Sequence, residues 1–157
     1  MAEIPVSRPF VPDGFVVPDP PATGDFTFEV LGPQHNEPDL AAWTGSMAHI
    51  QATPGFVGRS WPVRVYTADE NLQDLQMHAD DFVARTGFTW TVLDPATRET
   101  IGCLYVYPPK DDEAGVDAGV SSWVVADRAD LDAVLYRHIL GWLRAEWPFT
   151  RIRYAER

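Results

Sequence analysis

Cysteine, positive charge and long hydrophobic runs are all scarce in this sequence, and each scarcity excludes a class of protein. The single cysteine, Cys103, excludes an internal disulfide, and its place in the apolar run IGCLYVY favours a buried, unreactive thiol. No hydrophobic stretch approaches the ~20 residues that a membrane-spanning helix needs, and the opening MAEIPVSRPF lacks the features of a secretory signal. We therefore expect a cytoplasmic protein that does not contact membranes.

Basic residues are outnumbered by acidic ones, 12 against 23, which gives a formal net charge of −11. Most of such a surface would repel a phosphate backbone, so nucleic acid is not an expected partner. The same field attracts cations, which favours a substrate with an amine over an anionic one. An acidic surface is also a common route to solubility.

Hydrophobic residues make up 45% of the 157 residues and include six Trp and eight Phe, enough for a sizeable single core. Prolines gather at the amino terminus, where residues 1–25 hold six of them and favour extended over helical backbone. The apolar side chains of this arm are expected to lie against the domain or a partner subunit. We therefore divide the chain into a proline-rich arm, residues 1–25, and a single domain, residues 26–157.

The first part of the domain predicts a strand followed by two helices. Apolar and polar residues alternate over 26–31, which is typical of a half-buried strand. One helix is expected from Pro38, closed by Pro54 and Gly55, with these residues at three- and four-residue steps on its apolar face: Leu40, Trp43, Met47 and Ile50.

The second helix is expected to begin at Thr67, which forms a capping box with Glu70, and to end near Gly87. Its predicted core stripe consists of Leu72, Leu75, Ala79 and Phe82. His78, Asp74 and Asp81 share another side of this helix, which we interpret as solvated, and no metal site is expected.

The second part predicts a hairpin over 88–94 and 99–107, a strand over 119–126, a helix from about Leu131 to Trp147, and a last strand over 149–156. The order β, α, α, β, β, β, α, β indicates an α/β layered fold. Its sheet should be mixed and mostly antiparallel, with one right-handed β-α-β crossover.

From about Phe26 to Glu156, this order resembles the GCN5-related N-acetyltransferase (GNAT) family, whose central strand, phosphate turn, helix and next strand correspond to residues 118–154. Trp123-Val124 resembles the end of the central strand. The family turn, Gln or Arg, two residues, Gly, one residue, then Gly or Ala, is matched by RADLDA with Leu131 at the glycine position. A Leu side chain there obstructs the close approach of a pyrophosphate, and Asp127, Asp130 and Asp132 add negative charge.

The resemblance implies acetyl-CoA as the co-substrate, with pantetheine pairing on the central strand and pyrophosphate resting on the turn. The residues implied in cofactor binding are Trp123, Val124, Val125, Ala126, Arg128, Leu131 and Ala133. Typical members continue beyond the point that corresponds to Arg157. The sheet edge that a shortened carboxyl end exposes favours a homodimer.

The resemblance also implies candidates for the chemistry. Ser121, facing inward on the central strand, could orient a water, and Tyr105 could donate a proton to the leaving thiolate. Four residues are candidates for binding the acceptor: Phe56, Arg59, Trp61 and Tyr107. Packing in the core or at the surface is the alternative role for each. Asp117, just before the strand, is expected to be a solvated loop residue.

Two functions follow. The first is acetyl transfer from acetyl-CoA to a small amine. The second is a catalytically silent protein that keeps the acetyltransferase scaffold for binding a partner or another ligand. An unrelated α/β ligand-binding domain is a further alternative.

Overall fold

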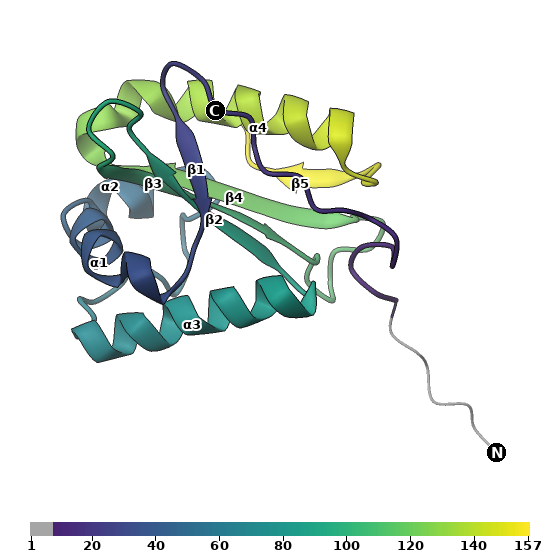
Figure 1. Ribbon diagram of the computed structural model, residues 1–157, viewed down its shortest axis with the longest axis horizontal. Coiled ribbons are helices and arrows are strands. Elements are labelled where there is room, and N and C mark those ends of the chain that lie inside the picture. Colours follow the sequence, from purple (N-terminus) through teal and green to yellow (C-terminus); the bar gives the residue numbers. More distant parts are fainter. Residues whose placement is uncertain (1–7) are drawn as a thin grey trace.

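The structure, a computed structural model, describes residues 8–157 and consists of a five-stranded sheet with helices on both faces (Figure 1). The strands, which neighbour one another in chain order, are β1 (Thr27–Val30), β2 (Phe88–Leu93), β3 (Thr100–Tyr107), β4 (Ala118–Val124) and β5 (Ile152–Tyr154). The helices and 3-10 turns are η1 (Pro33–His35), α1 (Asn36–Thr44), α2 (Met47–Ala52), α3 (Ala68–Ala84), η2 (Ala126–Leu131) and α4 (Asp132–Glu146). All neighbouring strands are antiparallel except β4 and β5, which are parallel and joined through α4. The predicted α/β class and mixed sheet are confirmed.

The helix predicted from Pro38 onward is in fact two helices, α1 and α2, and the prediction of one continuous helix was wrong. Gly45 ends α1, as its low helix propensity favours, and Ser46 begins the turn into α2. The hydroxyl of Ser46 accepts a hydrogen bond of 2.9 Å from the N–H of Ala126. The break therefore brings the α1–α2 turn against the end of β4.

Helix α3 begins with the predicted capping box, in which Thr67 and Glu70 each bond the other's backbone N–H. It ends at Ala84, close to Gly87 as predicted. The left-handed position of the helix stop is taken not by Gly87 but by Arg85, with φ of 62°. Its guanidinium donates to backbone carbonyls of the amino-terminal segment, which compensates the strain. Gly87 serves a different purpose, because a Cβ there would lie 2.2 Å from the ring of Tyr107.

The last strand, expected over 149–156, is only three residues long in the structure. The Asp117 carboxylate accepts hydrogen bonds of 2.7 and 2.9 Å from the N–H groups of Thr150 and Arg151. Asp117 is exposed, as expected of a loop residue, and fixes the turn that leads into β5.

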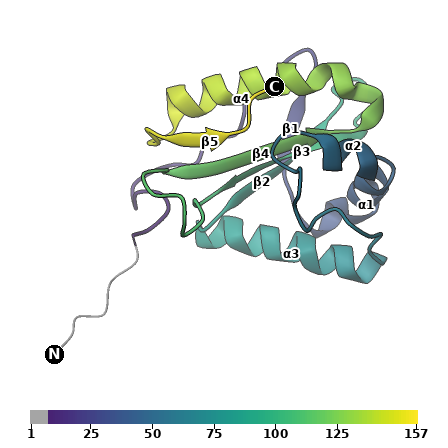
Figure 2. The ribbon, with the colours of Figure 1, turned by 180° about the vertical axis from the view of Figure 1, so that it is seen from behind.

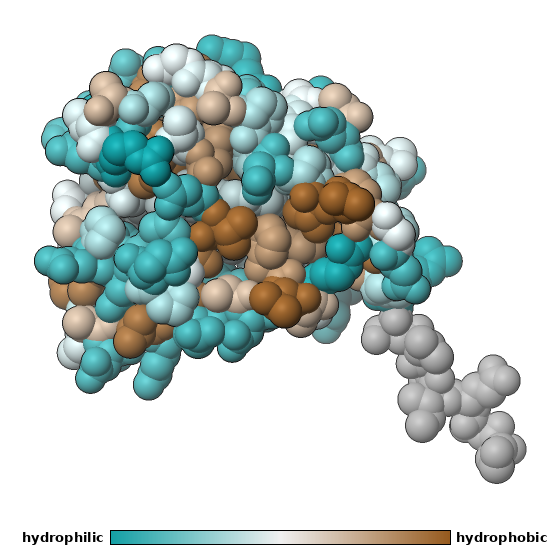
Figure 3. All heavy atoms as spheres, in the orientation of Figure 1, coloured by the Kyte–Doolittle hydropathy of each residue, from teal (hydrophilic) through white to brown (hydrophobic). Residues whose placement is uncertain are grey.

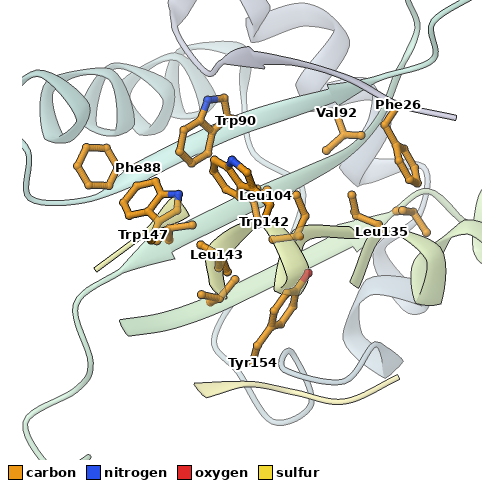
Figure 4. Close-up of a cluster of buried hydrophobic side chains, with 14 of the residues drawn as sticks. Phe26, Phe88, Trp90, Val92, Leu104, Leu135, Trp142, Leu143, Trp147 and Tyr154 are labelled. Atoms are coloured by element: carbon orange, nitrogen blue, oxygen red, sulfur yellow. The ribbon is translucent and has the colours of Figure 1, made fainter. Parts of the chain in front are cut away.

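Two hydrophobic cores lie on opposite faces of the sheet. The larger, between the sheet and α4, contains Phe26, Trp90, Leu104, Leu135, Trp142, Leu143 and Tyr154, among others (Figure 4). The smaller, between the sheet and the helices α1 to α3, contains Leu31, Trp43, Ile50, Phe56, Leu75, Cys103 and Trp123. Each large side chain buried in this way contributes about 1.5–3 kcal/mol of transfer free energy.

Two predictions about the smaller core have opposite outcomes. Cys103 is fully buried, and burial raises the pKa of its thiol, as expected of an unreactive cysteine. Leu72 was wrongly placed in the core stripe of α3, since 39% of it is exposed, while Leu75 is 1% exposed. The helix turns Leu75, not Leu72, toward the sheet.

The described part of the proline-rich arm lies against the domain. Val11 belongs to the larger core and is 2% exposed. Asp19 accepts a hydrogen bond from the Trp90 indole, and the carbonyl of Pro21 accepts one from His138 at 2.8 Å. Residues 1–7 of the predicted arm lie outside the described residues, and the boundary at residue 25 stays a prediction.

Figure 3, in the orientation of Figure 1, shows hydrophobic side chains gathered across the middle of this face, between more hydrophilic surfaces above and below. No helix of residues 8–157 is long and apolar enough to cross a membrane. The expected homodimer stays a prediction.

Candidate functional site

A pocket of about 370 Å³ lies beside β3 and β4 on the face of the sheet that α3 covers. The segment between α2 and α3 forms one wall, and Figure 2 shows this segment passing in front of the sheet. Six of the residues predicted for chemistry or acceptor binding line this one pocket: Phe56, Arg59, Trp61, Tyr105, Tyr107 and Ser121. Its volume lies within the usual range of about 300–1,000 Å³ for ligand pockets. The structure thus brings these residues together, and their individual roles stay predictions.

The aromatic wall of the pocket is also a packed cluster. Phe56 contacts Trp61 and Tyr105, with ring centroids 5.9 and 6.3 Å apart, and Trp61 also contacts Trp123. The Tyr105 hydroxyl accepts a 3.0 Å hydrogen bond from the Trp123 indole, and burial raises the pKa of Tyr105 well above its usual value. Packing and pocket lining therefore coexist in the same side chains, and Tyr105 stays protonated.

His78 was expected on a solvated helix side, and that interpretation was wrong, since its side chain is only 11% exposed. Its Nδ1 lies 2.8 Å from the Tyr107 hydroxyl, which donates in turn to the Asp81 carboxylate at 2.8 Å. When the single Tyr107 proton is donated to Asp81, Nδ1 is the donor to Tyr107, which is the tautomer we assign. The Nε2 atom then keeps its lone pair and lies 3.7 Å from Asp74.

Electrostatics favour the neutral form of His78. Burial lowers the pKa of His78, and the nearby carboxylates of Asp74 and Asp81 only partly oppose that shift. Burial raises the pKa of Asp74, opposed by the charge of His78. An uncharged imidazole with a free Nε2 can accept a proton near neutral pH.

Sequence spacing missed His78 for a simple reason. Its partners Thr89 and Tyr107 are on β2 and β3, 11 and 29 residues away in the chain. Helical periodicity relates His78 only to its own helix, where Leu75 marks the core side. The one feature of the sequence that could have indicated these contacts is that both partners, Thr89 and Tyr107, are polar residues within strands.

Basic side chains form the other side of the pocket. Arg59 comes from the segment after α2, Lys110 from the loop after β3, and Arg153 from β5. Arg153 forms an ion pair with Glu113, whose pKa is lowered by the backbone N–H of Lys110 and by Arg153. Burial, followed by the charge of Arg153, lowers the pKa of Arg59.

On the other edge of β4, the sheet opens. The parallel pairing of β4 with β5 ends at Val120 and Tyr154. The N–H of Val125 bonds to the carbonyl of Ile101 in β3 at 2.9 Å. Since backbone groups alternate along a strand, the N–H and carbonyl of Val124 point away from β3, toward this opening.

One side chain occupies the opening. The guanidinium of Arg157 donates hydrogen bonds of 2.6 Å to the carbonyls of Ser122 and Ala155 and to the carboxylate of Asp132. The Arg157 side chain is only 3% exposed, and its guanidinium also lies 5.7 Å from the ring centroid of Tyr154. No role was predicted for Arg157, because nothing in RIRYAER marks one arginine as buried.

The residues predicted to bind acetyl-CoA are spread around this opening. The Trp123 side chain lies in the smaller core, on the far face of the sheet. The N–H groups of Val125 and Ala126 already bond to Ile101 and Ser46. The remaining three are Arg128, which pairs with Asp94 at 2.8 Å, Leu131, which packs on the larger core, and Ala133, in the first turn of α4.

Within residues 8–157, no group of three or more His, Cys, Asp or Glu side chains is arranged to hold a metal ion. The pair formed by Asp74 and His78 lines the pocket. Its place in the pocket instead gives it access to a bound organic molecule.

Comparisons with known proteins show what this geometry resembles. No family model and no curated protein sequence matches the chain. Among solved structures, the ribosomal-protein-S5-alanine acetyltransferase of Vibrio fischeri matches with a TM-score of 0.64 at 12% identity, over 85% of this chain and 71% of that one. RimL, a ribosomal L7/L12 alpha-N-protein acetyltransferase in complex with coenzyme A, matches with a TM-score of 0.65 at 12% identity, over 86% and 72%.

A third structure agrees with these two. The Salmonella typhimurium acetyltransferase that modifies the N-terminal serine of L7/L12 matches with a TM-score of 0.62 at 9% identity, over 86% of this chain and 73% of that one. At such identities the comparisons establish the fold. The chain has the fold of the GNAT acetyltransferases, as the sequence resemblance implied.

Proposed function

We propose that this protein with the acetyltransferase fold transfers an acetyl group from acetyl-CoA to a primary amine bound in the aromatic pocket. One observation carries the proposal: the pocket and the opening are both built on β4. Gly119 and Ser121 line the pocket, while the backbone of Ser122 and Val124 faces the opening. An amine and an acyl carrier on the two sides of this strand would meet at it, and such proximity is a large part of catalysis.

The opening fits an extended amide chain in one respect and resists it in another. The free N–H and carbonyl of Val124 are the groups with which pantetheine would pair. Arg157, however, bonds the Ser122 carbonyl on the same edge, and it pairs with Asp132 at the start of α4. Binding of acetyl-CoA therefore requires the Arg157 side chain to leave the opening.

Acetyl-CoA, when bound, supplies an acetyl group activated as a thioester. The chain's own groups do the rest. The Val124 N–H is placed to donate to a carbonyl oxygen at the opening, and Ser121 can orient a water in the pocket. His78 can accept the proton of the incoming ammonium at Nε2, while its Nδ1–H stays bonded to Tyr107.

The acceptor amine is best sought first among peptide amino termini. The structural neighbour RimL is a ribosomal L7/L12 alpha-N-protein acetyltransferase, and the Salmonella typhimurium acetyltransferase modifies the N-terminal serine of L7/L12. The small amine expected from the sequence is the alternative. The pocket admits the first residues of a peptide, because it opens to solvent beside the exposed Arg59 and Lys110.

Calorimetric titration with acetyl-CoA tests the proposal. We expect weak binding to the wild-type protein and at least tenfold tighter binding to Arg157→Ala, since the variant frees the Ser122 carbonyl. Arg137→Ala, on the exposed side of α4, is the matched control. A thiol reagent can follow the release of free CoA, because the protein's own cysteine, Cys103, is buried and does not compete for the reagent. If neither the wild type nor Arg157→Ala binds at millimolar acetyl-CoA, the transferase proposal is wrong.

A second candidate function is binding without catalysis, and the closed opening specifically favours it. There, Arg157 bonds the Ser122 carbonyl and Ser46 bonds the Ala126 N–H, which are two of the groups that a cofactor would use. Replacing Leu131 with Gly separates the candidates. A large gain in CoA affinity in Leu131→Gly would mean that the native turn is impaired, whereas no gain would weaken the account of a silent protein.

A further inference from the structure

The basic side of the pocket stands out in a chain with a net charge of −11. Three of the chain's 12 basic residues, Arg59, Lys110 and Arg153, line it, whereas Asp74 is the one acidic side chain in the lining. Asp74 is held beside His78, on the α3 side. Even with Glu113, which pairs with Arg153, the β5 side of the pocket carries more positive than negative charge on an acidic protein.

Arg153 reaches the pocket because β4 has no side chain in its path. Its guanidinium lies against Gly119, where a Cβ would come within 2.1 Å of Nη2. The Nε atom donates to Glu113. Among residues 8–157, the Nη atoms form no hydrogen bond or ion pair, so they remain available to a ligand.

Arg59 is available in the same way. Its guanidinium lies 5.7 Å from the ring centroid of Phe56, and among the described residues it forms no side-chain hydrogen bond or ion pair. The charge of Arg153 disfavours the protonated form of Arg59 and the charge of Glu113 favours it, and both guanidinium groups line the same pocket. Two like charges at one pocket repel unless an anion lies between them, and a carboxylate suits guanidinium donors.

We infer that the acceptor carries a carboxylate near its amine, and that Arg59 and Arg153 bind this carboxylate while the amine lies toward Asp74 and His78. This inference rests on the proposed function only in identifying the ligand as the acetyl acceptor, because binding of the ligand does not require acetyl-CoA. The aromatic side chains of Phe56 and Trp61 between the two charged sides favour an apolar group in the same ligand. An acidic peptide beginning with an apolar residue has all three features.

The inference also reverses one expectation from composition. A field from the whole chain favours a cationic ligand over an anionic one. The local arrangement of Arg59 and Arg153 opposes that field at short range, where Coulomb interactions are strongest. Specificity for a carboxylate would therefore be visible against the charge of the rest of the surface.

Two peptides that differ in one charge provide the test. Phe-Glu-NH₂ and Phe-Gln-NH₂ share the amine and the aromatic ring, and only the first has a carboxylate. In calorimetric titrations without acetyl-CoA, we expect Phe-Glu-NH₂ to bind at least tenfold more tightly. Raising the salt concentration should reduce the preference.

Variants locate the preference. Arg59→Gln and Arg153→Gln should each remove most of it, and Arg137→Gln, on the exposed side of α4, should leave it unchanged. Circular dichroism confirms that each variant is folded. Equal or tighter binding of Phe-Gln-NH₂, persistence of the preference in the double arginine variant, or no binding of either peptide at millimolar concentration overturns the inference.

The same peptides distinguish this inference from the proposed function. Selective binding of Phe-Glu-NH₂ without any acetyl transfer would leave the carboxylate site standing and remove the transferase proposal. Acetyl transfer to both peptides at equal kcat/KM would leave the transferase proposal standing and remove the carboxylate site.

Discussion

Arginine is used in two opposite ways on the two sides of β4. On the α4 side, Arg157 is 3% exposed and its guanidinium donates to three oxygen atoms of the chain itself. On the α3 side, Arg59 and Arg153 present guanidinium groups to a pocket with donors to spare. A guanidinium whose donors are satisfied internally holds structure together, whereas one with free donors at a cavity is equipped to bind.

Carboxylates differ between the two sides in the same manner. Asp132, on the α4 side, has a cationic partner in Arg157 at 2.6 Å. Asp39, on the α1 and α3 side, is 4% exposed and accepts a hydrogen bond from the amide of Asn71, which has no charge. Pairing compensates the charge of Asp132, whereas Asp39 forms no ion pair within residues 8–157.

The largest effect is expected from breaking the pair on the α4 side. Arg157→Ala should lower the free energy of unfolding by about 3 kcal/mol, because it leaves Asp132 and the Ser122 carbonyl without their partner. Asp132→Asn should cost less, and the double variant should show a coupling energy of about 1–3 kcal/mol in urea unfolding. A loss below 1 kcal/mol for Arg157→Ala would mean that the opening is only weakly closed.

Removing the carboxylate charge of Asp39, on the other face of the sheet, should raise the free energy of unfolding. Burial raises the pKa of Asp39 to about 6. Between about pH 4 and 6, the unfolded chain releases this proton while the folded chain keeps it, so stability falls as pH rises through that window and stays lower above it. Asp39→Asn should therefore raise the free energy of unfolding at pH 8 by about 1–3 kcal/mol.

The pH profile provides the measurement for Asp39. Urea unfolding from pH 4 to 8 should show a smaller decline in Asp39→Asn than in the wild type, with the exposed Asp111→Asn as the control. The same decline in both proteins would show that Asp39 does not titrate within this window. Destabilisation at pH 8 would show that its charge is compensated after all.

The smallest effect on stability is expected at Gly119. In Gly119→Ala the new Cβ displaces the far end of Arg153, which is flexible, so the free energy of unfolding should change by about 1 kcal/mol or less. The preference for Phe-Glu-NH₂ should nevertheless fall toward that of Arg153→Gln. Gly141→Ala, where no atom lies within 4 Å of the new Cβ, is the matched control and should leave binding unchanged. Retained preference in Gly119→Ala would remove Arg153 from the carboxylate site.

The sequence predicted the sheet well because its information is local. Alternation over β1, the capping box of Thr67 and Glu70, and the buried runs of β2 to β4 each depend on neighbours within a few residues. The break between α1 and α2 was missed because the apolar spacing continues across Gly45. A tertiary contact, from Ser46 to Ala126, helps to stabilise the turn there.

The pocket was predicted in part, and the reason lies in the topology. Tyr105 and Tyr107 alternate on one strand and Ser121 lies opposite Tyr105 on the next, so hairpin register alone brings them together. The polar chain from His78 through Tyr107 to Asp81 requires α3 to pack on β3, and the sequence does not give the rotation of that helix. Arg157 requires the path of the chain after β5, where three residues of strand carry almost no pattern.

The amino-terminal segment acts as a strap across two helices that cover opposite faces of the sheet. Near its start, carbonyls of Pro12 and Phe15 receive the guanidinium of Arg85 at the end of α3, and farther along Pro21 receives His138 of α4. A truncated protein that begins at residue 26 would expose the aromatic side chains beneath Val11. It would also lose the hydrogen bonds from this segment to both helices. A truncated protein should therefore retain Pro9 and the residues that follow it, although this segment is rich in proline.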